Sequence, residues 1–218
     1  LAMSTAFGDR VASLPAPCPT IGEQIRQWDP QGFCDVAFSL LQKKNDDGEW
    51  DLLRPKIDVS FRGGMSIAYV GAKREDGERR GFNYRLSDVR GLLHFTDLGM
   101  KFDGVTASNG PLQVEARGEI DYEFADNEQY DVDVKAYDLP LDERVGLAIA
   151  GPGQELYKSL DADGSVDLRI AVKRKKPEPV GARVEIAAIF DGVSLSPEPF
   201  PLDVDDVRGE VIIDDDQI

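Results

Sequence analysis

Two stretches of the sequence decide the fold: YDVDVKA at residues 130–136 and VDLRIAV at residues 166–172. In both, every second side chain is apolar. Successive side chains of a β-strand point to opposite faces, so each stretch has one apolar and one polar face. Residues 36–40, 57–61 and 65–69 repeat the pattern. Because strands of a parallel sheet are buried on both faces and read as continuous apolar runs, this alternation predicts antiparallel strands.

Turn sequences separate these segments. Asp-Gly pairs occur at residues 47–48 and 76–77, and polar or Pro-containing connections occur at residues 126–128 and 176–179. Such residues tolerate the backbone conformations of hairpin turns. The chain is therefore predicted to be mainly β, an antiparallel meander of about nine or ten strands joined mostly by hairpins.

Two short helices are expected. Thr20 and Glu23 form a capping box, which predicts a helix near residues 20–29 that Pro30 ends. A second helix is expected to start near Asp142, and Gly151-Pro152-Gly153 should break it before a short turn through Leu156 and Leu160.

Composition narrows the function classes. The 218 residues include 41 acidic and 25 basic side chains, for a net charge of −16. Such a surface repels phosphate backbones and anionic headgroups, which argues against nucleic-acid binding and electrostatic membrane binding. Cys18 and Cys34 do not make a disulfide framework, and whether they pair is left open. We interpret the chain, which begins at Leu1 and stops within a strand-like pattern, as a fragment of something longer.

An internal repeat is the most informative pattern. WDPQGFCDV at residues 28–36 aligns with LDADGSVDL at 160–168, and GMSI at 64–67 aligns with GVSL at 192–195. FNYRLSDVRG at residues 82–91 then aligns with FPLDVDDVRG at 200–209. Three matches in the same order indicate one repeat and the beginning of a second.

Little in the sequence points to catalysis. The one histidine, His94, cannot by itself build a His-dependent triad or a multi-His metal site, and we expect it to face solvent from a strand. Asp161, Asp163 and Asp167 resemble a calcium loop, but an EF-hand frame starting at Asp161 has Val166 and Val172 at its key positions. We therefore expect a helix-to-strand turn there, a solvated hairpin tip at residues 173–176, no metal, no cofactor and no enzyme.

The phrase at residues 200–209, repeated more loosely at 82–91, resembles a strand–turn signature of the AsmA-like proteins of diderm bacteria. The segment AYDLPLD at residues 136–142, which leads to a helix and then to GSVDL at 164–168, is similar to their inter-repeat segment. The resemblance runs from about Trp28 to the end of the chain, and Asn83 departs from it where the family favours Pro.

The resemblance implies a fold and a task. The meander would curl into an open groove, a β-taco or solenoid-like trough with its helical segments at repeat junctions. Residues 1–140 would be a first repeat and 141–218 the truncated start of a second. Neighbouring repeats of the same chain would stack end to end, and an anchor upstream of Leu1 would hold the protein on the inner membrane. The implied task is non-enzymatic: to bind or conduct phospholipid or other acyl lipid across the periplasm, in outer-membrane biogenesis.

The in-phase alternation and the repeat suggest which side chains would line such a groove: Val132, Val134, Leu168, Ile170 and Val172. The alternative is a closed β-sandwich that serves as a binding or adhesion module of a repetitive surface protein, which explains the alternation and acidity equally well. A carbohydrate-active enzyme is a distant third, because no carboxylate pair stands out in an apolar setting.

Overall fold

The computed structural model describes most of the chain, and every structural statement below concerns the described residues. These are residues 2–3, 22, 25–42, 44, 47–50, 54–71, 81–82, 84–96, 98–121, 129–148, 152–174, 183–197 and 202–214. The strands are β1 (Ala2–Met3), β2 (Gly32–Phe33), β3 (Asp35–Leu41), β4 (Arg54–Arg62), β5 (Ser87–Thr96), β6 (Gly99–Asn109), β7 (Leu112–Asp121), β8 (Gln129–Pro140), β9 (Ala162–Asp163), β10 (Ser165–Arg174), β11 (Arg183–Leu195) and β12 (Val204–Asp214). Two helices, α3 (Glu143–Ala148) and α4 (Pro152–Leu160), separate β8 from β9.

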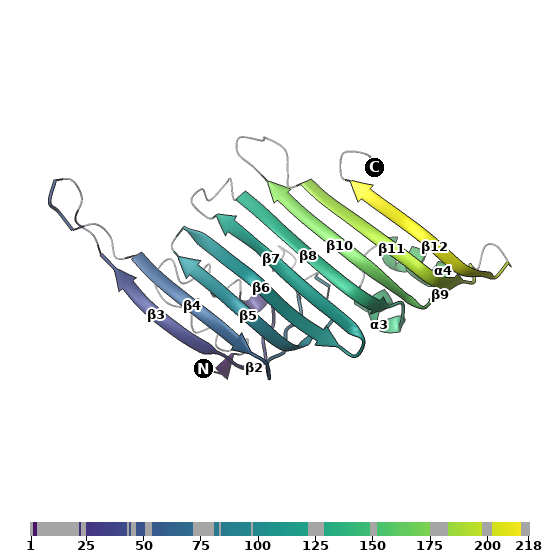
Figure 1. Cartoon of the computed structure of the whole chain (residues 1–218), viewed down its shortest axis with the longest axis horizontal. Coiled ribbons are helices and arrows are strands. Elements are labelled where there is room, and N and C mark those ends of the chain that lie inside the picture. Colours follow the sequence, from purple (N-terminus) through teal and green to yellow (C-terminus); the bar gives the residue numbers. More distant parts are fainter. Residues whose placement is uncertain are drawn as a thin grey trace.

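One large antiparallel sheet dominates the structure (Figure 1). It has ten strands, of which nine run in the order β12-β11-β10-β8-β7-β6-β5-β4-β3, while β9 pairs with β11 off this path. The sheet is not closed, since β3 and β12 are its two ends. The prediction of a mainly β antiparallel meander is confirmed.

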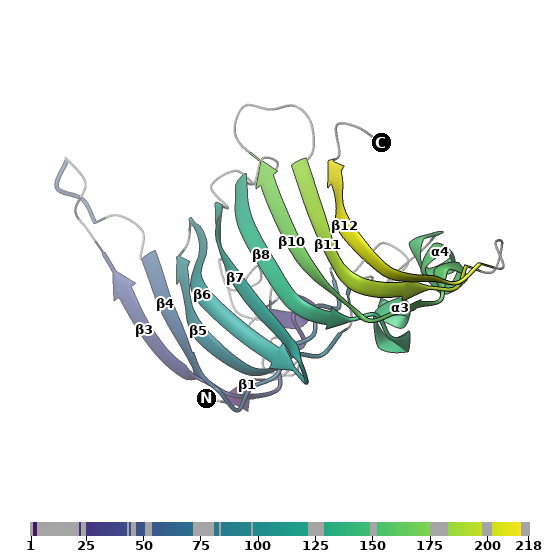
Figure 2. The same cartoon turned by 45° about the vertical axis from the view of Figure 1, so that its right-hand side comes forward.

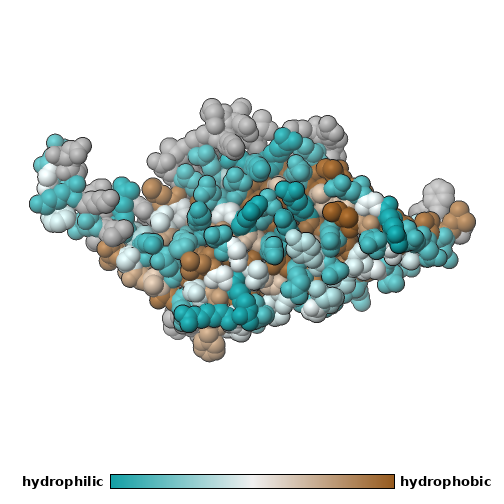
Figure 3. All heavy atoms as spheres, in the orientation of Figure 1, coloured by the Kyte–Doolittle hydropathy of each residue, from teal (hydrophilic) through white to brown (hydrophobic). Residues whose placement is uncertain are grey.

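The register sorts the side chains into two faces. Val132, Val134 and Ala136 of β8 lie opposite Val172, Ile170 and Leu168 of β10, so their apolar side chains share one face. Between them, Asp131, Asp133 and Lys135 point to the other face, opposite Lys173, Ala171 and Arg169. Figure 3 shows the second face, which is hydrophilic over most of its area with scattered apolar patches.

Two core clusters cover part of the apolar face. The first packs the helical turn at Ile25 and the loop residue Met65 against β4, β5 and β6, and it buries Val59, Phe61 and Phe95. The second gathers residues near the ends of β7, β8 and β10 with α3, namely Tyr84, Leu112, Leu139, Val145 and Val166. Figure 2 shows α3 and α4 together at this end of the sheet, where the strands bend along their length.

The helices differ in part from expectation. Residues 25–27 are helical, and the proposed cap at Thr20 lies outside the described residues. Pro152 does not simply stop a helix: it is the first residue of α4, a nine-residue helix where a short turn was expected. Proline suits the first helical position, because its missing N–H would have no partner there and its φ is already helical.

The aligned repeat positions share backbone conformation. Asp29 and Asp161 have φ of 32° and 42°, and Gly32 and Gly164 have φ of 123° and 125°. The same hydrogen bond recurs, since Ala68 N–H donates to Trp28 O and Ser196 N–H donates to Leu160 O, both at 3.1 Å. The division of the chain into repeats at residue 140 remains a prediction.

Candidate functional site

The five side chains proposed to line a groove lie together on one face of the sheet. Val132 and Val134 of β8 are directly opposite Val172 and Ile170 of β10, and Leu168 follows one step further along β10. All five are half-buried. We call Val132, Val134, Ile170 and Val172 the central apolar patch.

The central apolar patch lies outside both core clusters, whereas Leu168 packs against the second cluster and marks its boundary. The difference follows from position along the strands. Val166 is 4% exposed and Leu139 is 4% exposed, both at the end of the sheet that holds α3. Toward the other end of β8 and β10 the same alternation continues, but these apolar side chains belong to neither core cluster.

The apolar face continues from the central patch to both edges of the sheet. On one side, Val184 and Ile186 of β11 lie opposite Val172 and Ile170, and Ile186 is paired in turn with Ile213 of β12. On the other side, Val132 is paired with Gly118 of β7, and the pairing continues across β6, β5 and β4 to Val36 of β3. Exposure rises at the edges, to 43% at Ile213, 51% at Val211, 53% at Leu40 and 61% at Phe38.

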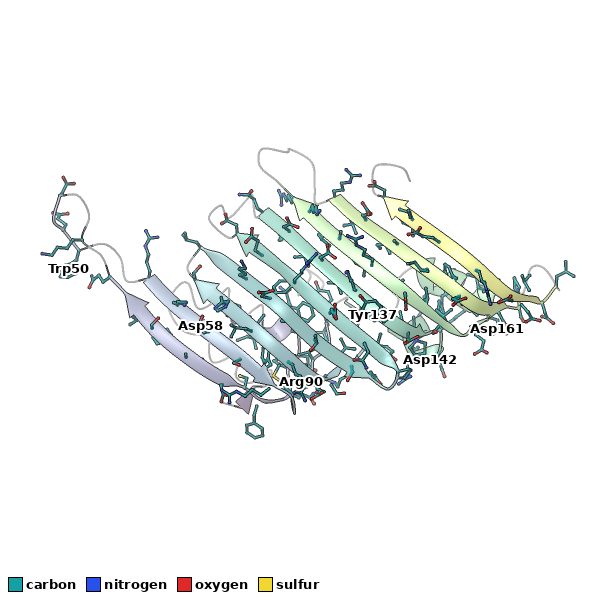
Figure 4. The ribbon with its side chains drawn as sticks, viewed as in Figure 1. Trp50, Asp58, Arg90, Tyr137, Asp142 and Asp161 are labelled. Carbon is teal, nitrogen blue, oxygen red and sulfur yellow. The ribbon has the colours of Figure 1, made fainter. Side chains whose placement is uncertain are left out.

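The opposite face carries charges. Asp58 of β4 lies across from His94 of β5, and the His94 Nδ1 and Asp58 Oδ1 atoms are 2.6 Å apart. This hydrogen bond lowers the pKa of Asp58, with Lys56 Nζ at 3.3 Å adding to the effect. His94, which was expected to face solvent from a strand, lies on this charged face of β5 with 33% of its side chain exposed. Its bond to Asp58 was not predicted. In Figure 4, Asp58 and Tyr137 are labelled on β4 and β8.

An N-cap fixes the first helix at the covered end of the sheet. Asp142 Oδ1 accepts hydrogen bonds from the backbone N–H groups of Arg144 and Val145, at 2.9 and 3.2 Å. Burial acts to raise the pKa of Asp142, but the hydrogen bonds from the Arg144 side chain and from these N–H groups outweigh it, so the pKa is lowered. Tyr157 O–H of α4 donates to the Asp142 carbonyl at 3.1 Å, which ties the two helices together beneath the second cluster.

The described residues offer no metal site. These residues contain no group of three or more side chains placed to hold a metal ion. Asp161 and Gly164 both have positive φ and form the helix-to-strand turn that was expected there. None of the described helices has the length and hydropathy needed to cross a bilayer.

Sequence reasoning missed the contribution of β11 and β12 to the apolar face. Residues 186–190 read Ile-Ala-Ala-Ile-Phe, a run in which alternation is hard to see. The register resolves it, because Ile186, Ala188 and Phe190 pair with Ile170, Leu168 and Val166. The sequence did contain one signal. Residues 166–172 alternate clearly, and the less regular strand that follows could be assigned its faces by pairing it with them.

In the described residues, fold and site together define a protein built mainly on one large open antiparallel sheet, apolar on one face and charged on the other. A scan of protein-family models found no match to the chain, and searches of curated proteins and of solved structures also found none.

Proposed function

We propose that this chain is a non-enzymatic segment that binds acyl chains of lipids along the apolar face of its sheet. The observation that carries the proposal is the central apolar patch: four branched aliphatic side chains, in register on two neighbouring strands, only half-buried and outside both core clusters. The bend of the strands would give this face the shape of an open groove (Figure 2).

A hydrocarbon chain suits this surface physically. The apolar face of a sheet needs a cover, which a second sheet or helices usually supply. An acyl chain supplies the same cover without hydrogen-bonding groups of its own, and the ladder already pairs the backbone of β8 with its neighbours β7 and β10. Each buried methylene contributes about 0.8 kcal/mol. The charged face would keep such a protein soluble.

The resemblance to AsmA-like proteins supports the wider setting of the proposal. In that setting the segment lies in the periplasm, in a protein anchored to the inner membrane, and passes phospholipid or another acyl lipid toward the outer membrane along neighbouring repeats. The rival interpretation, a closed β-sandwich, has less support, because the described strands form only one other sheet, the two-stranded β1–β2 pair.

The test is a substitution in the central apolar patch. Ile170→Asp places a carboxylate where the acyl chain would lie, and we expect phospholipid that co-purifies with the chain to be lost while the far-ultraviolet β spectrum is kept. Gln113→Asp is the matched control: Gln113 is exposed on the opposite face, across from the uncharged Ser108 and Tyr137, and this variant should retain lipid.

A second, more conservative variant tests the proposal in case Ile170→Asp fails to fold. Val172→Thr keeps the branched shape of the side chain and replaces one methyl group with a hydroxyl. Covering that hydroxyl with hydrocarbon costs free energy, so the variant should lower uptake of a fluorescent phospholipid while the far-ultraviolet β spectrum is kept. Delipidated wild-type chain that takes up no labelled phospholipid from vesicles would overturn the proposal.

A further inference from the structure

No described strand pairs with the outer edge of β3, the first strand of the large sheet. Residues 36–41 of β3 read VAFSLL, without a charged residue or proline, and β3 is the last described strand on its side. Natural proteins usually shield edge strands with charges, prolines or bulges, because bare edges pair with other chains. Val36, Phe38 and Leu40 are 39%, 61% and 53% exposed.

The repeat shows what covers the corresponding edge in the second copy. Positions 34–42 align with 166–174, so β3 corresponds to β10. The edge of β10 that corresponds to the bare edge of β3 is paired with β8, antiparallel, from Leu139 opposite Val166 to Tyr130 opposite Arg174. In the sheet, β8 therefore pairs with this edge of β10, whereas no described strand pairs with the corresponding edge of β3.

A remnant of the same pairing is present beside β3. Ala2 of β1 lies opposite Phe33, and Met3 lies opposite Gly32. In the second copy, Pro140 lies opposite Ser165, and Leu141 N–H donates to Gly164 O at 2.9 Å. Because Gly32 and Phe33 align with Gly164 and Ser165, β1 occupies the place of the last residues of β8.

We propose that the edge of β3 is a docking site for an extended polypeptide strand that runs antiparallel to β3 and uses the register of β8 on β10. The strand would place apolar side chains on the apolar face, as Ala136, Val134 and Val132 do, here opposite Val36, Phe38 and Leu40. Its polar side chains would point to the charged face.

Asp35 of β3 is placed to bind the backbone irregularity that a strand like β8 contains. In β8, Asp138 has φ of 55°, and its N–H donates to Asp167 Oδ1 at 2.9 Å where the pairing shifts register. Asp35 aligns with Asp167 and can accept the corresponding N–H. It now pairs with Arg62 at 2.8 Å, with both side chains more than half exposed, so little energy opposes an exchange of partner.

Strand direction disfavours a second copy joined head to tail. Eight antiparallel pairings separate β3 from β12 along the sheet, so the two edge strands run the same way. Joining β12 of one copy to β3 of the next would create a parallel pair in a sheet whose described pairings are all antiparallel. A strand like β8 avoids this mismatch.

The test adds the strand. A copy of residues 129–139 is fused directly ahead of Ala2, and hydrogen exchange is followed at the β3 amides. We expect exchange in β3 to slow by roughly tenfold or more, since paired amides are protected. In the matched control the copy of Val134 is replaced by Pro, which removes an amide donor and breaks the ladder. The control should leave β3 exchange unchanged.

Register is checked by cross-linking, after Cys18 and Cys34 are changed to Ser. Phe38→Cys should form a disulfide with a cysteine at the copy of Val134, directly opposite, and not with one at the copy of Val132. A synthetic peptide of residues 129–139 added to the unaltered chain gives the same exchange test should the fusion fail to fold.

Three outcomes would overturn the proposal. One is unchanged β3 exchange with both fusion and peptide, and another is equal cross-linking in both registers. The third is a dimer of the unaltered chain whose β3 amides are already protected, because a second copy would then fill the edge. Since none of these measurements involves lipid, they can fail independently of the proposed function.

Discussion

The two helix-to-strand turns of the repeat have the same backbone in different surroundings. Asp29 and Gly32 match Asp161 and Gly164 in φ to within about ten degrees. In the first turn, a Cβ on Gly32 would lie 2.6 Å from Gly64 O and 2.9 Å from Met65 Cα. In the second, a Cβ on Gly164 would meet Val193 Cα at 3.4 Å, an ordinary contact. The short sequence Asp-x-x-Gly thus sets the backbone, while its packing is set by residues far along the chain.

The largest expected effect tests this difference directly. Gly32→Ala should destabilise the fold by about 3 to 4 kcal/mol, because it adds both backbone strain at positive φ and a clash with immobile backbone atoms. Gly164→Ala carries the strain alone and should cost about 2 kcal/mol. Urea denaturation of both variants measures the difference, and equal losses would show that the closer packing of the first turn contributes nothing.

A smaller effect is expected at the ion pair that braces only the first turn. Arg85 pairs with the Asp29 carboxylate and donates from Nη1 to Asp29 O at 3.2 Å and to Ser66 Oγ at 3.3 Å. The aligned residue in the second copy is Asp203, which accepts a hydrogen bond from Ser196 Oγ instead.

Arg85→Ala should therefore lower stability by about 1 kcal/mol, since the pair is about one-third exposed and screened by water. Asp203→Ala, the matched change in the second copy, should lower it by less. Thermal unfolding of the two variants under the same buffer gives the comparison. A larger loss at Asp203 would mean that the second turn depends more on its side-chain contacts than the first.

The sequence predicted local features well, because those features depend on local chemistry. Alternation at residues 130–136 and 166–172 predicted the two faces correctly, since the side-chain period of a strand is fixed at two. The resemblance of FNYRLSDVRG to FPLDVDDVRG marked two strands whose Asp88 and Asp206 both adopt positive φ, at 51° and 57°.

Features that depend on the neighbours of a strand could not be predicted. Val166 and Val172 alternate in the same phase of one strand, yet Val166 is buried in the second cluster and Val172 is only half-buried. Their difference comes from α3, which covers only one end of the sheet. Likewise the sequence placed His94 on a strand but could not pair it with Asp58, because cross-strand partners depend on register.

The Asp58–His94 pair supplies the smallest expected effect. It lies on the charged face and occurs in only one of the two copies. Asp58 and His94 correspond, through the aligned register, to Ala187 and Ile212 of β11 and β12. The hydrogen bond from His94 lowers the pKa of Asp58 in the folded chain. A carboxyl whose folded pKa is depressed stabilises the fold fully above its unfolded pKa, about 3.9, and this stabilisation is lost as pH falls through the lower folded value.

Asp58→Ala should therefore destabilise the chain slightly at pH 6 and make progressively less difference as the pH falls below about 4. Asp103→Ala, which removes another exposed carboxylate from the same face, is the control, and urea midpoints between pH 3 and 6 are the measurement. A penalty for Asp58→Ala that stays constant across this range would show that the carboxylate acts through packing rather than through its charge-assisted bond to His94, and would leave the two copies alike in their response to acid.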